Sequence, residues 1–260
     1  MLSLYLWAIS PAILIVVFFF FRDKFREPPK IVFYTFVLGF LFILPLSFLN
    51  IIFDDFAYGL KASYFAKDVF KHLFRAAFHE ELYKYLILIF FCSRHTKFNE
   101  PMDAVVYGIA VSLGFSAHEN INYILNFQDY NSTWQEMAAI RFVPTVMHGT
   151  NGVVMGMFLS QALFFKLPAQ RRLLLALLVP VFFHGIYNLL VVNSFGLGLI
   201  FLLIVLIYVF SLYRKLRALQ SFKIIEDEIK YSAEVGLVMK SILMTLGIVV
   251  LTTFLVINIF

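Results

Sequence analysis

Long apolar runs alternate with short clusters of charged residues along the whole chain. A helix that crosses roughly 30 Å of hydrocarbon needs about 20 predominantly apolar residues, and the runs here meet that length. The pattern predicts eight membrane-spanning helices, approximately at residues 2–21, 31–53, 71–92, 102–125, 138–165, 173–193, 195–213 and 236–260. The predicted fold is therefore an all-α, polytopic transmembrane bundle. Because we find no internal repeat, residues 1–260 are expected to form a single integral membrane domain.

Two further stretches carry apolar residues at helical spacing among mixed charges. Residues 64–75 are predicted to lead into the third helix along the outer membrane interface. Residues 215–233 are predicted to form a cytoplasmic surface helix, or alternatively a solvated connector. The sixth and seventh helices are expected to meet at a tight turn at residues 193–196.

The composition supports a membrane protein and excludes a soluble globular one. Hydrophobic residues make up 62% of the chain, against about 45–50% in soluble domains. The formal charge of +5 would suit nucleic acid, but the basic residues lie in short clusters between apolar runs. We therefore expect the lipid bilayer, and no nucleic acid, as a partner. Cys92 is the single cysteine, which excludes an intrachain disulfide.

Lys and Arg gather in alternate loops, and this asymmetry predicts the orientation of the chain, because basic loops stay in the cytoplasm. The poorer set of loops carries Lys61 and Lys67. The N-terminus is thus expected outside and, with eight spans, so is the C-terminus. The richer set carries fourteen basic residues: Arg22, Lys24, Arg26, Lys30, Arg94, Lys97, Lys166, Arg171, Arg172, Arg214, Lys215, Arg217, Lys223 and Lys230.

Ionisable side chains occur inside four of the predicted helices. Inserting such a group near the bilayer centre costs about 2.5–3.5 kcal/mol, so each is a functional candidate. Independent structural residues need not share one depth, but five of these lie roughly 9–15 Å from the outer helix ends, at ~1.5 Å per residue. We therefore predict one site in the outer half of the bilayer, opening outward. Its members are Glu80, Glu81, Glu119, His148 and His184.

Helical spacing suggests which side chains act together. Residues four apart share a face of a helix, as Glu80 and Lys84 do, and as His184 and Asn188 do. Glu80 and Glu81 project about 100° apart. One of the two glutamates could therefore face a substrate while the other pairs with Lys84.

The same residues form four motifs in order on successive helices. They are Glu80-Glu81-x-x-Lys84, Phe115-x-x-x-Glu119-Asn120, His148-x-x-x-Gly152 and His184-x-x-x-Asn188, preceded by Asp103 and Tyr107-Gly108. In these motifs the chain resembles the PrsW family of intramembrane peptidases, relatives of the CAAX prenyl endopeptidase and Abi group. The resemblance covers residues 65–193, which it marks as a catalytic core between flanking residues 1–64 and 194–260. It implies cleavage of membrane-anchored proteins, including anti-sigma factors by some members, in the plasma membrane of a prokaryote.

Amide hydrolysis needs a base for water, donors for the oxyanion and an acid for the leaving amine. Glu80 is the predicted base, and His148 and His184 are expected to polarise the carbonyl or orient the water. Asn188 and Asn120 are expected to donate hydrogen bonds. The predicted catalytic set is Glu80, Glu81, His148 and His184, supported by Lys84, Glu119, Asn120 and Asn188.

Zinc is the rival chemistry, and no cofactor is certain from the sequence. Two His and one Glu form a recognised hydrolytic ligand set, for which Glu81, His148 and His184 are the candidates. Gly152 lacks a side chain and should let another helix approach closely. Arg141, near an outer helix end, is expected to snorkel to the interface. A proton-coupled transporter and a non-catalytic membrane scaffold are the alternative functions, since intramembrane Glu, His and Lys also build proton relays.

Overall fold

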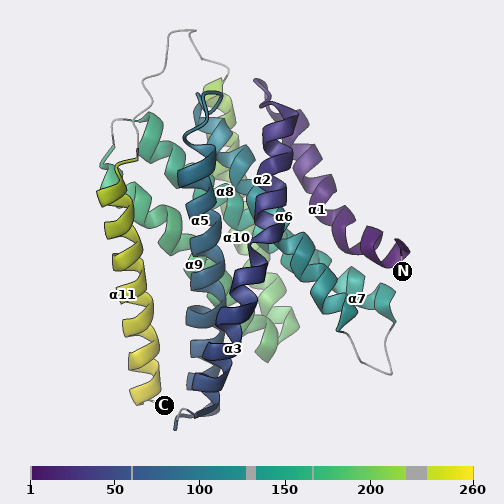
Figure 1. Cartoon of the computed structure of the whole chain (residues 1–260), viewed down its shortest axis with the longest axis vertical. Coiled ribbons are helices and arrows are strands. Elements are labelled where there is room, and N and C mark those ends of the chain that lie inside the picture. The colour runs from purple at the N-terminus through teal and green to yellow at the C-terminus, as the bar shows by residue number, and fades with distance from the viewer. Residues whose placement is uncertain (1, 60, 127–132, 166, 221–232, 260) are drawn as a thin grey trace.

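The structure is a computed structural model that describes residues 2–59, 61–126, 133–165, 167–220 and 233–259, and these residues form helices without strands (Figure 1). The predicted all-α membrane bundle is confirmed, and so is the tight turn between the sixth and seventh spans. The predicted surface helix falls largely on residues 221–232, which lie outside the described ranges. The helices are α1 (Leu2–Arg22), α2 (Pro29–Leu41), α3 (Ile43–Gly59), α4 (Tyr64–Val69), η1 (Phe70–Phe78), α5 (His79–Ile87), η2 (Leu88–Cys92), α6 (Pro101–Leu125), α7 (Trp134–Ile140), α8 (Phe142–Phe164), α9 (Ala169–Asn193), α10 (Phe195–Leu219) and α11 (Val235–Ile259).

Apolar helices surround a more polar centre. By length and composition, five helical stretches could cross a membrane: Ser3–Arg22, Pro29–Leu46, Ala169–Asn193, Phe195–Ala218 and Val235–Ile259. Large apolar side chains on the outer helices are exposed, as expected of a surface that faces lipid. By contrast, α6 is buried without interruption from residue 102 to residue 117. The apolar helices thus shield α6, which carries Glu119, from the lipid.

The contact between α6 and α8 is the most extensive in the bundle, and two glycines make it possible. A Cβ atom added at Gly152 would lie 2.3 Å from the carbonyl oxygen of Gly108, and one added at Gly108 would lie 2.3 Å from that of Gly152. The two backbones therefore touch, as the sequence predicted for Gly152. This contact fixes the spacing between the helices that carry Glu119 and His148.

Substituting Ala for Gly152 is expected to destabilise the protein by about 1–3 kcal/mol, because overpacking would push α6 away from α8. The unfolding midpoint in detergent measures this. Gly247→Ala is the matched control, since a Cβ atom there meets nothing within 4 Å. A Gly152→Ala protein with the midpoint of that control would show that the close approach is unimportant.

Two predicted spans are broken, and a proline explains each break. The second span divides at Phe42 into α2 and α3, and the fifth divides at Arg141 into α7 and α8. Pro45 and Pro144 stand at the third position of the new helix in each case. Proline has no N–H and its ring clashes with the carbonyl four residues earlier, so the preceding helix ends.

The third predicted span is one continuous helical rod with two π-helical stretches, η1 and η2. The rod runs through α4, η1, α5 and η2, and η1 (Phe70–Phe78) directly precedes the turn that carries Glu80 and Glu81. The apolar pattern alone does not predict this wider turn. Short π-helical stretches occur frequently at functional sites.

Candidate active site

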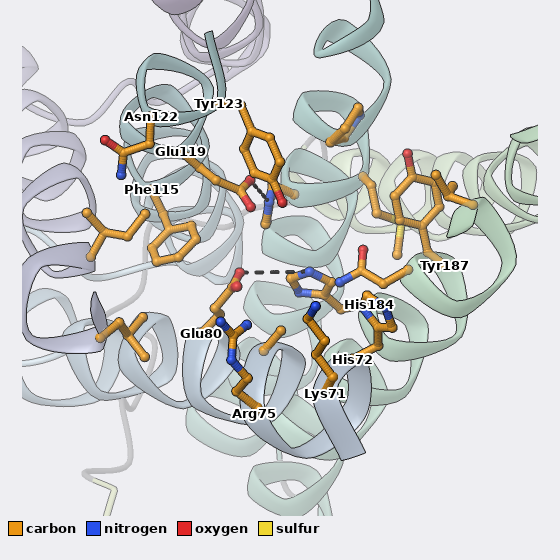
Figure 2. A pocket seen from close by; sticks show the side chains of 18 of the residues that line it. Lys71, His72, Arg75, Glu80, Phe115, Glu119, Asn122, Tyr123, His184 and Tyr187 are labelled. Carbon is orange, nitrogen blue, oxygen red and sulfur yellow. Dashed lines mark hydrogen bonds and ion pairs between the residues drawn. The ribbon is translucent and has the colours of Figure 1, made fainter. Parts of the chain in front are cut away.

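A cavity of about 510 Å³ opens among α3, η1, α6, α8 and α9. Glu80, Glu119, His148 and His184 line it, so four of the five side chains predicted at one depth come together. Figure 2 shows Glu80 and Glu119 pointing into the cavity from neighbouring helices, with His184 facing Glu80. Asn188 also lines the cavity.

Glu81, the fifth group, is fully buried and lies behind the cavity wall. Its Oε1 atom accepts from Lys84 Nζ at 2.7 Å and lies 2.9 Å from His184 Nδ1. Asn151 Nδ2 adds a longer contact of 3.4 Å. The two adjacent glutamates thus have different environments, as their 100° separation suggested. Lys84 pairs with Glu81 three residues away, and not with Glu80 on its own face.

The ring of His184 presents a free lone pair to Glu80. A carboxylate only accepts hydrogen bonds, so His184 Nδ1 donates to Glu81 and the neutral ring is unprotonated at Nε2. That Nε2 atom lies 3.8 Å from Glu80 Oε2, which is buried without a hydrogen-bond partner among the described residues. The gap is too long for a direct hydrogen bond. A water molecule that lies to one side of the two atoms can contact both and bridge them.

His148 is held from both sides of its ring. Lys84 Nζ lies 3.0 Å from Nδ1, and an ammonium only donates, so Nδ1 accepts. The neutral ring therefore carries its proton on Nε2, 3.1 Å from Glu119 Oε2. The rings of His148 and His184 meet edge to face at 5.0 Å. In their neutral forms, the His184 ring thus offers a lone pair to the site, whereas both nitrogens of His148 are engaged with Lys84 and Glu119.

Arg141 is a site residue that the sequence analysis missed. The prediction that it snorkels is wrong, because its Nη2 lies 2.5 Å from Glu119 Oε2 and its Nε donates to Asn120 Oδ1 at 2.9 Å. Its guanidinium also lies 4.2 Å from the centroid of the Tyr123 ring. Arg141 lies inside the predicted span 138–165. Because burying a charge in a membrane span costs free energy, its position there could have indicated a role in the site.

Asn120 lies outside the cavity lining. Its amide donates to Ala8 O at 3.1 Å and to Thr145 Oγ1 at 2.9 Å, so it joins α1 and α8 to α6. Its donors are therefore already engaged away from the cavity. On the other wall, Lys71, His72 and Arg75 of η1 line the cavity, although the sequence placed them only at an interface.

A metal ion would fit the same cavity. Glu80, His148 and His184 offer ligand atoms that all lie within 4.8 Å of one another. His184 has the carboxylate of Glu81 behind it, an arrangement that typically orients a ligating histidine. To bind the ion, His148 would have to break its contact with Lys84 or with Glu119. This ligand set differs from the predicted one, because Glu80 takes the place of Glu81, which is occupied behind the wall.

The comparisons with known proteins show the family to which the chain belongs. Residues 27–213 match the model of a family described as PrsW family intramembrane metalloprotease. The chain belongs to this family. The PrsW-family chain is therefore an intramembrane peptidase, and the predicted resemblance is confirmed.

Several relatives named Protease PrsW are similar over most of this PrsW-family chain. That of Oceanobacillus iheyensis is 31% identical over 221 residues, which cover 84% of this chain and 97% of the relative. That of Geobacillus kaustophilus is 32% identical over 72% of this chain and 79% of its own length, and that of Bacillus subtilis is 32% identical over 69% and 78%. No solved structure matches. A transporter or scaffold finds no support among these relatives.

Proposed function

We propose that this cavity hydrolyses a peptide bond of a membrane-anchored protein with a water molecule held between Glu80 and His184. The observation that carries the proposal is the 3.8 Å gap between Glu80 Oε2 and His184 Nε2, two atoms that face each other with free acceptor capacity. A water molecule there would donate one hydrogen bond to each. Such a position lets Glu80 remove a proton as the water attacks.

The remaining residues suit the other parts of the reaction. The attacking oxygen forms a bond to the carbonyl carbon, and the negative charge that develops on the carbonyl oxygen needs a donor. His148 Nε2–H would offer one after turning away from Glu119 Oε2, to which it donates at 3.1 Å. Glu80 then passes its proton to the amine nitrogen as the C–N bond breaks. Glu81 and Lys84 act from behind by fixing the orientations of His184 and His148.

The family description also favours a metal, and Glu80, His148 and His184 would hold it. A bound divalent ion such as zinc supplies Lewis-acid polarisation of the water and the carbonyl. If one oxygen of Glu80 bound the ion, the other would stay free to accept the proton.

Removing the metal with a chelator is therefore expected to abolish cleavage, and adding zinc is expected to restore it. The measurement is the cleavage rate of the purified protein together with its zinc content by elemental analysis. Full activity in protein that contains no metal would assign the reaction to the Glu80 and His184 pair alone.

The walls of the cavity favour a substrate that is anchored in the membrane. Apolar Ile43, Leu46 and Val191 face the polar groups across it. A helical substrate has its carbonyls engaged in hydrogen bonds, so an unwound or flexible segment is the form that could be attacked. We infer a single-span protein such as an anti-sigma factor. The charge pattern favours a site in the outer half of a bacterial plasma membrane.

The test is reconstitution of the purified protein in liposomes with a panel of single-span membrane proteins, among them anti-sigma factors. Mass spectrometry of the fragments then locates the cleaved bonds. We expect cleavage in or beside the outer half of the span of one substrate class. Absence of cleavage together with proton flux through the liposome membrane would contradict the proposal and favour transport.

Substituting Lys for Arg141 is expected to lower the rate by about 10–100-fold, the usual loss when a residue that orients a site group is changed. Lys keeps the charge but cannot contact Glu119 and Asn120 at once. Initial cleavage rates measure the effect, with Arg22→Lys as a control far from the cavity. Equal rates for both variants would show that Arg141 does not position Glu119.

A further inference from the structure

A second group of buried acidic side chains lies at the end of the bundle that the charge pattern predicts to be cytoplasmic. Asp23 follows α1, and Glu100 and Asp103 stand at the start of α6. They are 3%, 1% and 0% exposed. One carboxylate oxygen from each lies within 4.8 Å of the others. The proposed peptidase does not use them.

A helix cap explains part of this acidic cluster of Asp23, Glu100 and Asp103. Asp103 Oδ2 accepts from the backbone N–H of Asn99 at 2.7 Å and of Glu100 at 2.8 Å, which completes a capping box at the start of α6. The cap uses only one oxygen of Asp103. In the described part of the chain, Asp103 Oδ1 and Asp23 Oδ2 are buried without a hydrogen-bond partner.

Gln220 reaches the acidic cluster from a different helix, just after α10. Its Nε2 donates to Asp23 Oδ1 at 2.8 Å and to Glu100 Oε1 at 2.6 Å. Gln220 is 5% exposed, and its Oε1 is also buried with no partner in the described ranges. Carboxylate and amide oxygens gathered from three segments are the ligands that hard divalent cations prefer.

Three basic residues close to Asp23 in the sequence are engaged with aromatic rings. Arg22, Lys24 and Arg26 each lie over an aromatic ring, 5.0 to 5.3 Å from its centroid. Within the described residues, none of the three forms an ion pair with Asp23 or Asp103. Burying an ionised carboxylate costs free energy unless the group is paired with a positive charge, protonated or bound to a metal ion.

We propose that Asp23, Glu100, Asp103 and Gln220 bind one hard divalent cation of the Mg²⁺ and Ca²⁺ class. The cation ties the loop after α1 and the end of α10 to the start of α6. It is separate from the metal proposed for the cavity, whose donors include two histidines. Because it binds the folded chain, it stabilises the fold in proportion to the logarithm of its concentration.

The test uses Mn²⁺, a spectroscopic substitute for Mg²⁺, with the full-length protein stripped of metals. Electron paramagnetic resonance measures free Mn²⁺ during a titration, and Mg²⁺ and Ca²⁺ are added as competitors. We expect a site that Asp103→Asn and Gln220→Leu weaken at least about tenfold. Asp55→Asn, on an exposed carboxylate of α3, is the matched control and should bind as the wild type does.

Glu80→Gln separates this site from the cavity. Mn²⁺ binding that survives in this variant and falls in Asp103→Asn supports the proposal. Binding lost only in Glu80→Gln overturns it, because the ion would then lie in the cavity. Wild-type protein that binds no Mn²⁺ at millimolar concentration also overturns it, and the carboxyl groups would then share protons. That result does not depend on whether any variant folds.

Discussion

Glu80→Gln is expected to lower the rate of substrate cleavage by about 10²–10⁴-fold, the usual contribution of a positioned general base. Glutamine has nearly the same shape but cannot accept and return the proton. Glu80 Oε2 has no hydrogen-bond partner among the described residues, so little native interaction is lost. The unfolding midpoint should therefore be unchanged or higher. Initial rates in liposomes and thermal unfolding in detergent measure the two effects.

Asp55→Asn makes the matched control for this substitution. It also removes one carboxylate charge, but from an exposed position on α3. We expect this control to cleave at the wild-type rate. A Glu80→Gln protein that folds and cleaves like the control would exclude Glu80 as the base and as a required ligand.

Lys84→Met is expected to destabilise the protein by about 3–5 kcal/mol, the usual cost of leaving a buried charge unpaired. Lys84 and Glu81 have 1% and 0% of their side chains exposed, and their charged atoms lie 2.7 Å apart. Lys84 also donates to His148, so cleavage should be lost as well. The unfolding midpoint measures stability, and the liposome assay measures cleavage.

The double variant Lys84→Met and Glu81→Gln separates the two consequences. It removes both charges, so most of the stability should return. Cleavage should stay low, because His148 and His184 still lack their charged partners. A Lys84→Met protein as stable as the wild type would contradict the buried ion pair.

The arrangement of the helices was largely predictable, because membrane helices obey strong local rules. The lengths of the apolar runs predicted the spans, and Gly152 predicted a close contact between two helices. The breaks at Phe42 and Arg141 were missed although Pro45 and Pro144 are visible in the sequence. The apolar runs continue past both prolines and therefore predict unbroken spans. The helices nevertheless end just before each proline, because proline cannot continue the preceding helix.

The sequence predicted most of the residues that form the site but not which of their side chains contact one another. Spacing along one helix allowed Lys84 to meet either glutamate, and contacts with other helices decided for Glu81. Arg141 was missed because its partner Glu119 belongs to another helix. The acidic cluster was missed for a similar reason, since Asp23 and Gln220 are 197 positions apart.

We propose that water activated in the cavity cuts a peptide bond of a membrane-anchored protein. The most direct measurement is the mass of the fragments that wild-type and Glu80→Gln proteins produce from one single-span substrate in liposomes prepared in H₂¹⁸O. The wild type should give a fragment whose new carboxyl terminus carries one ¹⁸O, from a bond in or beside the span, and Glu80→Gln should give almost none. Equal amounts of labelled fragment from both proteins would contradict the account, because the hydrolysis would then take place without Glu80.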